Sequence, residues 1–307
     1  MPSPKPQTFT VIEQRGIVTT LVKLNIRKQP ATNGPVIAVM TPQKGIEFSA
    51  LIPDGEMISN NSVWYRDTNG NYFWSGGVAV SAPVLPDSKS GKAKINFSGI
   101  DFSGIELPIT QHQCSNCTNW LQLHFENQFS DSVKNTPFEK ELLYAIACQE
   151  TAIYWQKWIN DHTPDEILAR CVFDANGDVN GTRHVFPKNT TAFIERYGQQ
   201  LANELIAEAN ATRAIRSWGP KQWVYAGYGI FQYDIQAIQT DEAFFTQKLW
   251  YHMPDCLDRV IKELNSKWAA HPNDLFATIK AYNGSGQRAE NYAKNVSQFL
   301  NWIEEAS

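Results

Sequence analysis

One glutamate is the residue of this chain best suited to acid–base chemistry. Glu150 falls on the same helical stripe as Leu143, Ile146, Ala147 and Tyr154. A carboxylate on an apolar face loses hydration, which raises its pKa and favours the protonated form near neutral pH. Such a group can act as a general acid. The alternative is a glutamate at the edge of the stripe that reaches water or pairs with an arginine.

Two later segments combine residue types that are typical of binding sites. Residues 227–234, GYGIFQYD, bring together glycines, aromatic rings, an amide and a carboxylate. Residues 281–292, AYNGSGQRAENY, place an asparagine and two glycines between two predicted helices. Each segment alone reads as an ordinary turn. Their order after Glu150 makes a three-part pattern.

This pattern resembles the lysozyme superfamily, particularly goose-type lysozymes and soluble lytic transglycosylases. Its parts here are AIACQET (145–151), GYGIFQYD and AYNGSG followed by Tyr292. The resemblance implies a glycosidase that cleaves the β-1,4 bond between N-acetylmuramic acid and N-acetylglucosamine in peptidoglycan. Two departures stand out. Thr151 occupies the position of the usual serine, and the 77 positions from Glu150 to Gly227 imply an inserted lobe.

The resemblance assigns roles position by position. Glu150 corresponds to the acid that protonates the glycosidic oxygen, and Asp234 to a carboxylate that positions water. The residues expected to bind the sugar chain or to lie beside the catalytic glutamate are Gly229, Phe231, Gln232, Tyr282, Asn283 and Tyr292. This chemistry needs no cofactor and no metal.

The mechanism depends on a second carboxylate. Hydrolysis with inversion needs a base about 6.5–9.5 Å from the acid, with room for a water molecule between them. Asp234 is the first candidate, and Asp174 and Asp178 are weaker ones. Without such a base, the resemblance implies a lytic transglycosylase, in which the 6-hydroxyl of the substrate attacks and a 1,6-anhydro product forms.

Residues 18–80 predict short strands separated by turns. Asn69-Gly70 lies between two aromatic runs and predicts a two-residue hairpin. LNIRKQP (24–30), SVWYRD (62–67) and YFWSGGV (72–78) resemble bacterial SH3-like modules. That resemblance implies a small all-β SH3-like barrel that tethers a hydrolase to the cell wall; a structural spacer is the alternative.

A multidomain chain with three parts is therefore expected: an SH3-like domain over 1–80, a linker over 81–113 and a mainly α lysozyme-like domain over 114–307. No regular strand–helix alternation indicates a parallel sheet. Thr136 and Thr163 each begin a capping box with a following proline. Helices are expected near 137–160, 164–171, 189–212, 241–269, 273–282 and 287–305.

Composition excludes several classes of protein. The 307 residues include 10 Trp, 11 Tyr and 16 Phe, which argues against a disordered chain. The net charge of −4 lacks the basic field that nucleic-acid binding needs. There is no apolar run of 18 residues, so no membrane span is expected. The opening MPSPKPQTFT has no apolar signal segment, so an enzyme acting in the wall, in the periplasm or outside the cell would need another export route or a signal already removed.

Two segments invite a metal-site interpretation. Residues 174–181, DANGDVNG, alternate oxygen ligands as a calcium loop does, but Val179 and Val185 stand where that loop needs Gly and Glu. A polar turn is the preferred interpretation. Cys114 and Cys117, near His112 and His124, lack the remaining ligands of a zinc finger. A disulfide or free thiols are expected there.

Two rival functions come from other classes. A cysteine peptidase would need a histidine beside its nucleophile, and the sequence around Cys148 offers none. The second rival is a non-catalytic wall-binding protein, which would keep a lysozyme-like groove but would not cleave the glycan. Trp218 and Trp223 are the tryptophans expected in the groove. The resemblance implies peptidoglycan glycan strands as the partner of this protein, and it leaves any delivery or immunity partner unknown.

Overall fold

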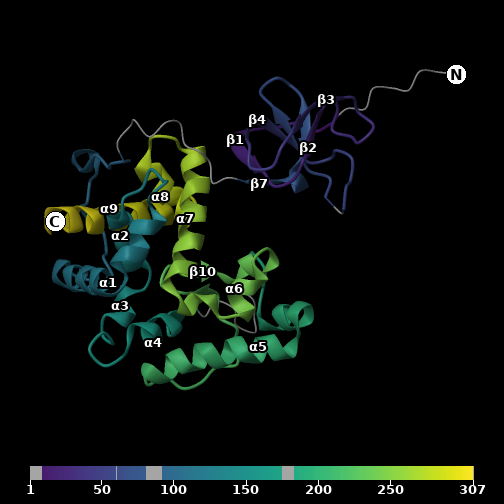
Figure 1. The fold of residues 1–307 in the computed structure, drawn as a ribbon. Coiled ribbons are helices and arrows are strands. Elements are labelled where there is room, and N and C mark those ends of the chain that lie inside the picture. Colours follow the sequence, from purple (N-terminus) through teal and green to yellow (C-terminus); the bar gives the residue numbers. More distant parts are fainter. Residues whose placement is uncertain (1–8, 60, 81–91, 175–182, 307) are drawn as a thin grey trace. The chain divides into compact units, whose positions relative to one another are not determined.

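The computed structural model describes residues 9–59, 61–80, 92–174 and 183–306 (Figure 1). The chain divides into two compact units, Met1–Ser90 and Gly91–Ser307. The first is built from antiparallel strands and the second mostly from helices. The expected order of a β part followed by a mainly α part is thus confirmed. None of the described helices is both long enough and apolar enough to cross a membrane.

The first unit is one antiparallel sheet in the order β3-β2-β6-β5-β4-β1-β7. Its elements are β1 (Ile12–Thr20), β2 (Leu24–Arg27), β3 (Val36–Met40), β4 (Gly45–Ile52), β5 (Trp64–Asp67), β6 (Tyr72–Trp74), η1 (Ser75–Gly77) and β7 (Val78–Val80). In the described residues β3 and β7 remain edge strands that do not pair with each other. The sheet is therefore not closed, which corrects the expected barrel.

A single apolar cluster holds this sheet together. Alternate residues of β4 point inward, including Ile46 and Phe48, because successive side chains of a strand face opposite sides. Phe48 and Phe73 both contact the ring of Tyr65, with centroids 4.4 and 5.5 Å from it. The cluster is completed by Val18, Leu24, Ile26 and Val78.

The predicted hairpin at Asn69-Gly70 exists, but its loop has four residues instead of two. Strand β5 ends at Asp67 and β6 begins at Tyr72. The Asp67 side chain explains the difference, because its Oδ1 accepts hydrogen bonds from the backbone N–H of Asn69 (2.9 Å) and Asn71 (2.7 Å). Gly70 supplies the positive φ of 78° that the turn requires.

The second unit contains nine α-helices and a three-stranded antiparallel sheet within its described residues. Its longer helices are α1 (Gln111–Ser132), α2 (Lys140–Glu150), α5 (Thr190–Ile215), α7 (Met253–Ala270), α8 (Leu275–Asn283) and α9 (Gly286–Ala306). Its shorter elements are η2 (Phe97–Gly99), α3 (Ala152–Trp155), α4 (Pro164–Ala169), β8 (Val172–Phe173), β9 (Gly227–Tyr228), β10 (Tyr233–Asp234), η3 (Ile235–Gln239), α6 (Glu242–Thr246) and η4 (Leu249–Tyr251).

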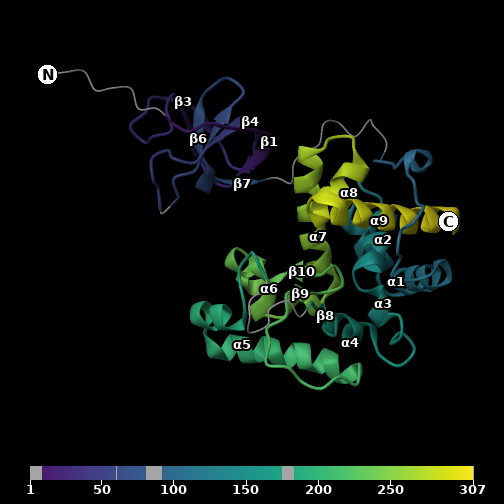
Figure 2. The ribbon, with the colours of Figure 1, turned by 180° about the vertical axis from the view of Figure 1, so that it is seen from behind.

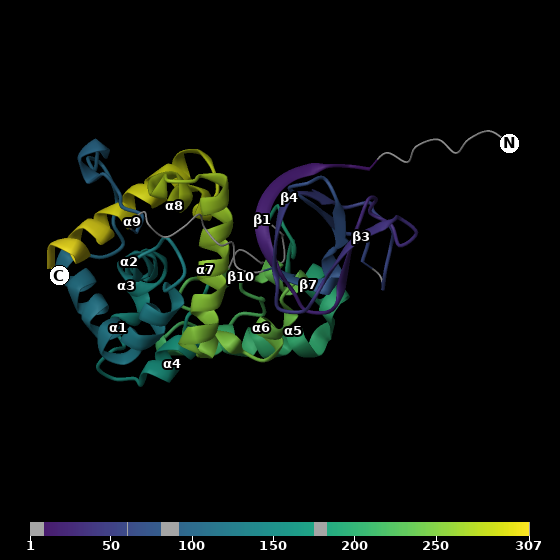
Figure 3. The same cartoon turned by 45° about the horizontal axis from the view of Figure 1, so that its top comes forward.

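Helix α7 joins two parts of this unit. On one side lie α1, α2, α8 and α9, and on the other lie the small sheet, α5 and α6 (Figures 1, 2 and 3). α7 packs against α1, α8 and β10, so it contacts both parts. Many large aromatic side chains of the unit are buried, among them Trp155, Trp250 and Phe244.

The second half of the expected linker packs on the helical unit. The Lys92 ammonium group donates to the backbone carbonyls of Val133 (2.9 Å) and Phe138 (2.8 Å). The Asn295 amide donates to the carbonyl of Glu106 at 2.9 Å. Residues 92–110 therefore belong structurally to the second unit, and α1 begins directly after them with Thr110 as its N-cap.

Helix boundaries depart from the sequence pattern at four places. The helix expected over 137–160 is interrupted at Thr151, so Tyr154 lies on α3 and not on the helix that ends at Glu150. Thr163 forms the predicted capping box, but Thr136 does not cap a helix, because its hydroxyl instead accepts from the N–H of Phe138 within a turn and α2 begins only at Lys140. The helix expected over 241–269 is interrupted at Lys248, where φ is +55°. Helix α1 was not among the expected helices.

Candidate active site

The segment GYGIFQYD forms a tight hairpin. Strands β9 and β10 pair antiparallel, with Tyr228 opposite Tyr233 and Gly227 opposite Asp234. Gly229 and Gln232 both adopt positive φ, 78° and 54°, which lets four residues reverse the chain. β8 pairs with the outer side of β9 and completes the small sheet.

Two glycines make the close packing of this hairpin feasible. A Cβ on Gly227 would lie 2.2 Å from Oε1 of Gln232, so a larger residue would displace that side chain. A Cβ on Gly229 would lie 2.9 Å from the sulfur of Cys256 on α7. The Gln232 amide donates to the carbonyl of Gly229 at 2.8 Å, which fixes the turn internally.

Glu150 is the last residue of α2, and the next residue attaches the helix end to the hairpin. Thr151 leaves the helical conformation at φ −138°. Its buried hydroxyl donates to the carbonyl of Ile230 at 2.8 Å and accepts from the indole N–H of Trp155 at 3.0 Å. Thr151, which stands where the resemblance implies a serine, therefore uses its hydroxyl in two hydrogen bonds.

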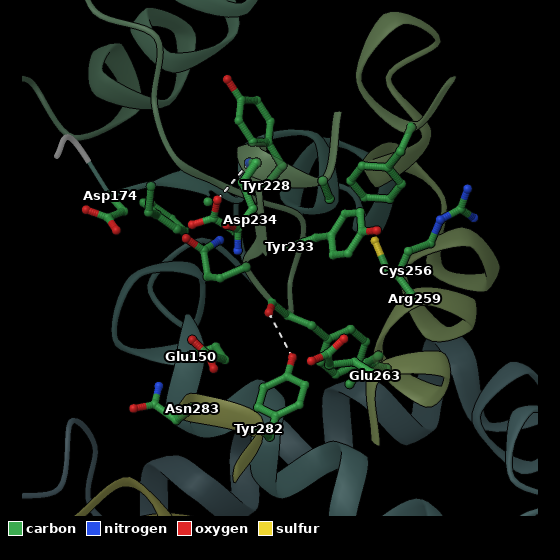
Figure 4. Close-up of a pocket in the computed structure, with 18 of the residues that line it drawn as sticks. Glu150, Asp174, Tyr228, Tyr233, Asp234, Cys256, Arg259, Glu263, Tyr282 and Asn283 are labelled. Carbon is green, nitrogen blue, oxygen red and sulfur yellow. Dashed lines mark hydrogen bonds between the residues drawn. The ribbon is translucent and has the colours of Figure 1, made fainter. Parts of the chain in front are cut away.

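A pocket of about 790 Å³ lies where the helix end meets the hairpin (Figure 4). Its walls come from α2, the hairpin, α7 and α8, which are far apart in the sequence. Residues that the sequence singled out and that line the pocket are Glu150, Phe231, Gln232, Asp234, Tyr282 and Asn283. A volume of this size is within the usual range of ligand sites.

Burial changes the chemistry of Glu150. The carboxyl group is largely withdrawn from water, which raises its pKa from 4.5 to about 7. Two contacts act in the opposite direction: the phenol of Tyr292 donates a 2.6 Å hydrogen bond to Oε1, and the positive charge of Arg288 favours the carboxylate. Desolvation is the largest of these influences, so the pKa of Glu150 stays raised, close to neutral pH.

Two tyrosines connect the glutamate to the rest of the pocket wall. Tyr292 on α9 and Tyr282 on α8 stack with ring centroids 6.2 Å apart. The Tyr282 hydroxyl donates to the carbonyl of Phe231 at 3.4 Å (Figure 4). Burial and the nearby carboxyl of Glu150 raise the pKa of both phenols, which keeps them neutral hydrogen-bond donors.

Asp234 also lines the pocket, but it is held by an ion pair. Its Oδ1 accepts from the guanidinium group of Arg183 at 2.7 Å and from the N–H of Gln236 at 2.7 Å. Arg183 is 7% exposed, whereas Asp234 is 39% exposed and keeps contact with water. The sequence pattern did not identify Arg183 as an Asp234 partner, because no local spacing relates positions 51 residues apart.

Further carboxylates face the same pocket. Asp174 and Asp234 lie in the upper part of Figure 4, while Glu150 and Asn283 lie in its lower part. Glu263 of α7 was missed by sequence reasoning and also lines the pocket, where it pairs with Lys267 at 2.7 Å. The one sequence feature that could have pointed to Glu263 is its position on a predicted amphipathic helix. Asp178 and the rest of the calcium-like segment 175–182 lie outside the described residues.

Two expected site residues lie outside the pocket lining and contact residues that form it. Gly229 and Tyr292 are not among the residues that line it. Gly229 packs against Cys256, and Tyr292 reaches the carboxyl of Glu150. Neither Trp218 nor Trp223 lines the pocket. The described parts of the chain contain no cluster of three His, Cys, Asp or Glu side chains suited to hold a metal ion.

Cys148 does not have the surroundings of a catalytic nucleophile. Its side chain is fully buried, and it contacts the thiols of Cys114 and Cys117. These neighbours and burial raise the pKa of the Cys148 thiol well above its ordinary value of 9.0. A thiol that stays protonated is unsuited to the attack on a peptide carbonyl that a cysteine peptidase requires.

The pKa of Glu150 can be measured directly. Because the Tyr292 hydrogen bond stabilises the carboxylate, Tyr292→Phe should raise this pKa further above 7, by about one unit. Carbon-13 NMR of the glutamate carboxyl groups measures it, with the resonance assigned by its loss in Glu150→Gln. Tyr197→Phe, which removes a phenol from α5 outside the pocket, should leave it unchanged. Titration of Glu150 near 4.5 in the wild type would contradict the desolvation argument.

Comparisons of the chain with protein-family models, with curated proteins and with solved structures find no match.

Proposed function

We propose that the protein is a peptidoglycan-cleaving glycosidase with Glu150 as its general acid. One observation carries the proposal: a partly buried glutamate with a pKa of about 7 faces a 790 Å³ pocket lined by amide, phenol and carboxylate groups. A general acid works best when its pKa lies near the working pH. The resemblance of the AIACQET, GYGIFQYD and AYNGSG segments to goose-type lysozymes and lytic transglycosylases supports the glycan strand as the substrate.

The proposed reaction begins with the protonated carboxyl of Glu150. It transfers its proton to the glycosidic oxygen as the bond to the N-acetylmuramic acid carbon breaks. Tyr292 donates a hydrogen bond to Oε1 of Glu150, so the carboxyl group keeps the same orientation before and after the proton transfer. Asn283 and the aromatic rings at the pocket surface supply amide and stacking contacts for the N-acetyl sugars, whereas the Gln232 amide is used by the carbonyls of Gly229 and Cys171.

The role of Asp234 decides between two forms of this reaction. As a base it would activate a water molecule for inverting hydrolysis, and its 39% exposure allows water to reach it. Its ion pair with Arg183 favours the second form, a lytic transglycosylase, because Oδ1 already accepts hydrogen bonds from the guanidinium group and from the N–H of Gln236. In that form the 6-hydroxyl of the substrate attacks and closes a 1,6-anhydro ring.

The first unit is proposed to act as a wall-binding module of the bacterial SH3-like type. Its sheet, its aromatic strands β5 and β6 and the LNIRKQP segment support this role. The protein would then work in the cell wall, in the periplasm or outside the cell, with the first unit increasing the local concentration of glycan.

Mass spectrometry of digested peptidoglycan tests the proposed activity. Wild-type protein should release muropeptides, and Glu150→Gln should reduce the rate by at least about 100-fold, because the amide has no proton to give. The wild-type rate should fall as pH rises through about 7, where Glu150 loses its proton. The control Glu195→Gln removes a carboxylate from α5, away from the pocket, and should keep full activity. Peptide-bond cleavage, or no cleavage while the glycan still binds, would contradict the proposal.

The ends of the released glycans decide the role of Asp234. If Asp234 is the base, products carry free reducing ends and Asp234→Asn slows turnover by about 100-fold or more. If the reaction is a transglycosylation, products carry anhydro ends and Asp234→Asn retains activity. Asp131→Asn is the control, because it also removes a carboxylate that pairs with a cation, Lys134, and neither residue lines the pocket. Thermal unfolding of each variant separates a loss of fold from a loss of chemistry.

An exposed tryptophan next to the pocket offers a separate test of glycan binding. The Arg216 guanidinium carbon lies 4.1 Å from the ring centroid of Tyr154, a pocket residue, and 3.5 Å from that of Trp218. Trp218 is 48% exposed, so one surface of this three-layer stack remains accessible. We expect it to contact sugar rings beyond the pocket.

Calorimetry in a Glu150→Gln background, where glycan is not consumed, measures this contact. Trp218→Ala should weaken binding of a glycan hexasaccharide by roughly fivefold to tenfold and leave disaccharide binding unchanged, because only the longer chain reaches the ring. Leu123→Ala removes another exposed apolar side chain, 78% exposed on α1, and should change neither. Equal loss for both glycans would rule out the extended contact.

A further inference from the structure

Three buried cysteines gather where α1 packs against α2. Cys114 and Cys117 lie one turn apart on α1, and Cys148 lies on α2, two residues before Glu150. The sulfur atoms of Cys114 and Cys148 are 3.9 Å apart, and Cys148 also contacts the thiol of Cys117. All of them are free thiols and at most 1% exposed.

The other two cysteines of the chain have different partners. The thiol of Cys171 lies 3.3 Å from the carbonyl of Ile167, and that of Cys256 lies 3.5 Å from the carbonyl of Trp250. Backbone carbonyls are not redox partners, and burial raises the pKa of Cys256 to about 12. Burial and, after it, Cys256 raise the pKa of the Cys171 thiol, so these two thiols interact with each other and form a second pair, to be followed separately from the cluster on α1 and α2.

Access to the cluster is uneven. A small cavity of about 60 Å³ is lined by Cys114, Thr118 and Trp302, and it does not include Cys117 or Cys148. That volume holds about two water molecules, which is enough for hydrogen peroxide and too small for glutathione. The Cys114 and Cys148 thiols lie within hydrogen-bonding distance of each other, and a hydrogen bond that Cys148 donates to the Cys114 thiolate lowers the pKa of Cys114.

We propose that Cys114 and Cys148 form a peroxide-oxidised disulfide that covalently joins α1 to the helix ending at Glu150. In the first step the Cys114 thiolate attacks one oxygen of the peroxide, the O–O bond breaks, and a sulfenic acid and hydroxide form. In the second step the Cys148 sulfur attacks the Cys114 sulfur and the S–O bond breaks. Cys148 is still protonated when it attacks, and its proton passes to the departing hydroxyl group, which leaves as water, so the step needs no free Cys148 thiolate. Two thiols have then lost two electrons to one peroxide.

The sulfur atoms must approach each other by about 2 Å to reach bonding distance. Rotation of the two side chains about χ1 with a small shift of the helices supplies this movement. The bond closes a loop across the α1–α2 connection, which restricts the unfolded chain. Oxidised protein should therefore unfold at a temperature roughly 5 °C or more above that of reduced protein.

Peroxide treatment followed by tryptic digestion and mass spectrometry tests the proposal. The disulfide should join the peptide 95–134 to the peptide 141–157, and tandem fragmentation between Ser115 and Asn116 should assign the bond to Cys114. The number of free thiols should fall from five to three, and reduction should restore both the thiols and the lower unfolding temperature. This measurement needs only wild-type protein, so it does not depend on the folding of a variant.

Variants provide the matching controls. Cys117→Ser, Cys171→Ser and Cys256→Ser should retain the cross-link, and Cys114→Ser and Cys148→Ser should lose it. Three results would overturn the proposal: a disulfide within peptide 95–134, a bond assigned to Cys117, or oxidation to sulfinic acid without any cross-link. None of these readouts uses enzymatic activity, so the result stands apart from the proposed glycosidase.

Discussion

The carboxyl group of Glu150 is largely withdrawn from water, and the pocket is organised around this one desolvated group. Burial alone would favour the neutral acid strongly, but the Tyr292 hydrogen bond and the charge of Arg288 bring the pKa back to about 7. The group can therefore exist in either protonation state near neutral pH. That balance requires α9, which carries both partners, to be held against the end of α2.

Hydrogen bonds to backbone carbonyls hold the rest of the pocket wall. Thr151 bonds to the carbonyl of Ile230, and Tyr282 bonds to that of Phe231, so two helices are attached to one hairpin turn. Gly229 lets the turn approach α7 closely. Through these contacts, α2, α7 and α8 together fix the position of the hairpin relative to Glu150.

The long insertion between Glu150 and Gly227 takes part in the site. It contributes Asp174 to the pocket wall and Arg183 to the ion pair with Asp234. A buried network ties it to the helices: Glu208 of α5 accepts from Arg170 (2.8 Å), Lys248 (2.6 Å) and Tyr251 (2.6 Å). The insertion is thus anchored by charge-assisted hydrogen bonds at its centre.

Local spacing in the sequence determined the features that depend on near neighbours. It placed Glu150 on a buried helical stripe, predicted the Thr163 cap and located a hairpin at Asn69-Gly70, because periodicity and turn chemistry act over a few residues. Tertiary structure decided the open edges of the sheet, the Asp67 side-chain turn and the pairing of Asp234 with Arg183. It also brought Tyr292 to Glu150 across 142 positions. Such contacts depend on how packed elements meet in space, which no short-range pattern encodes.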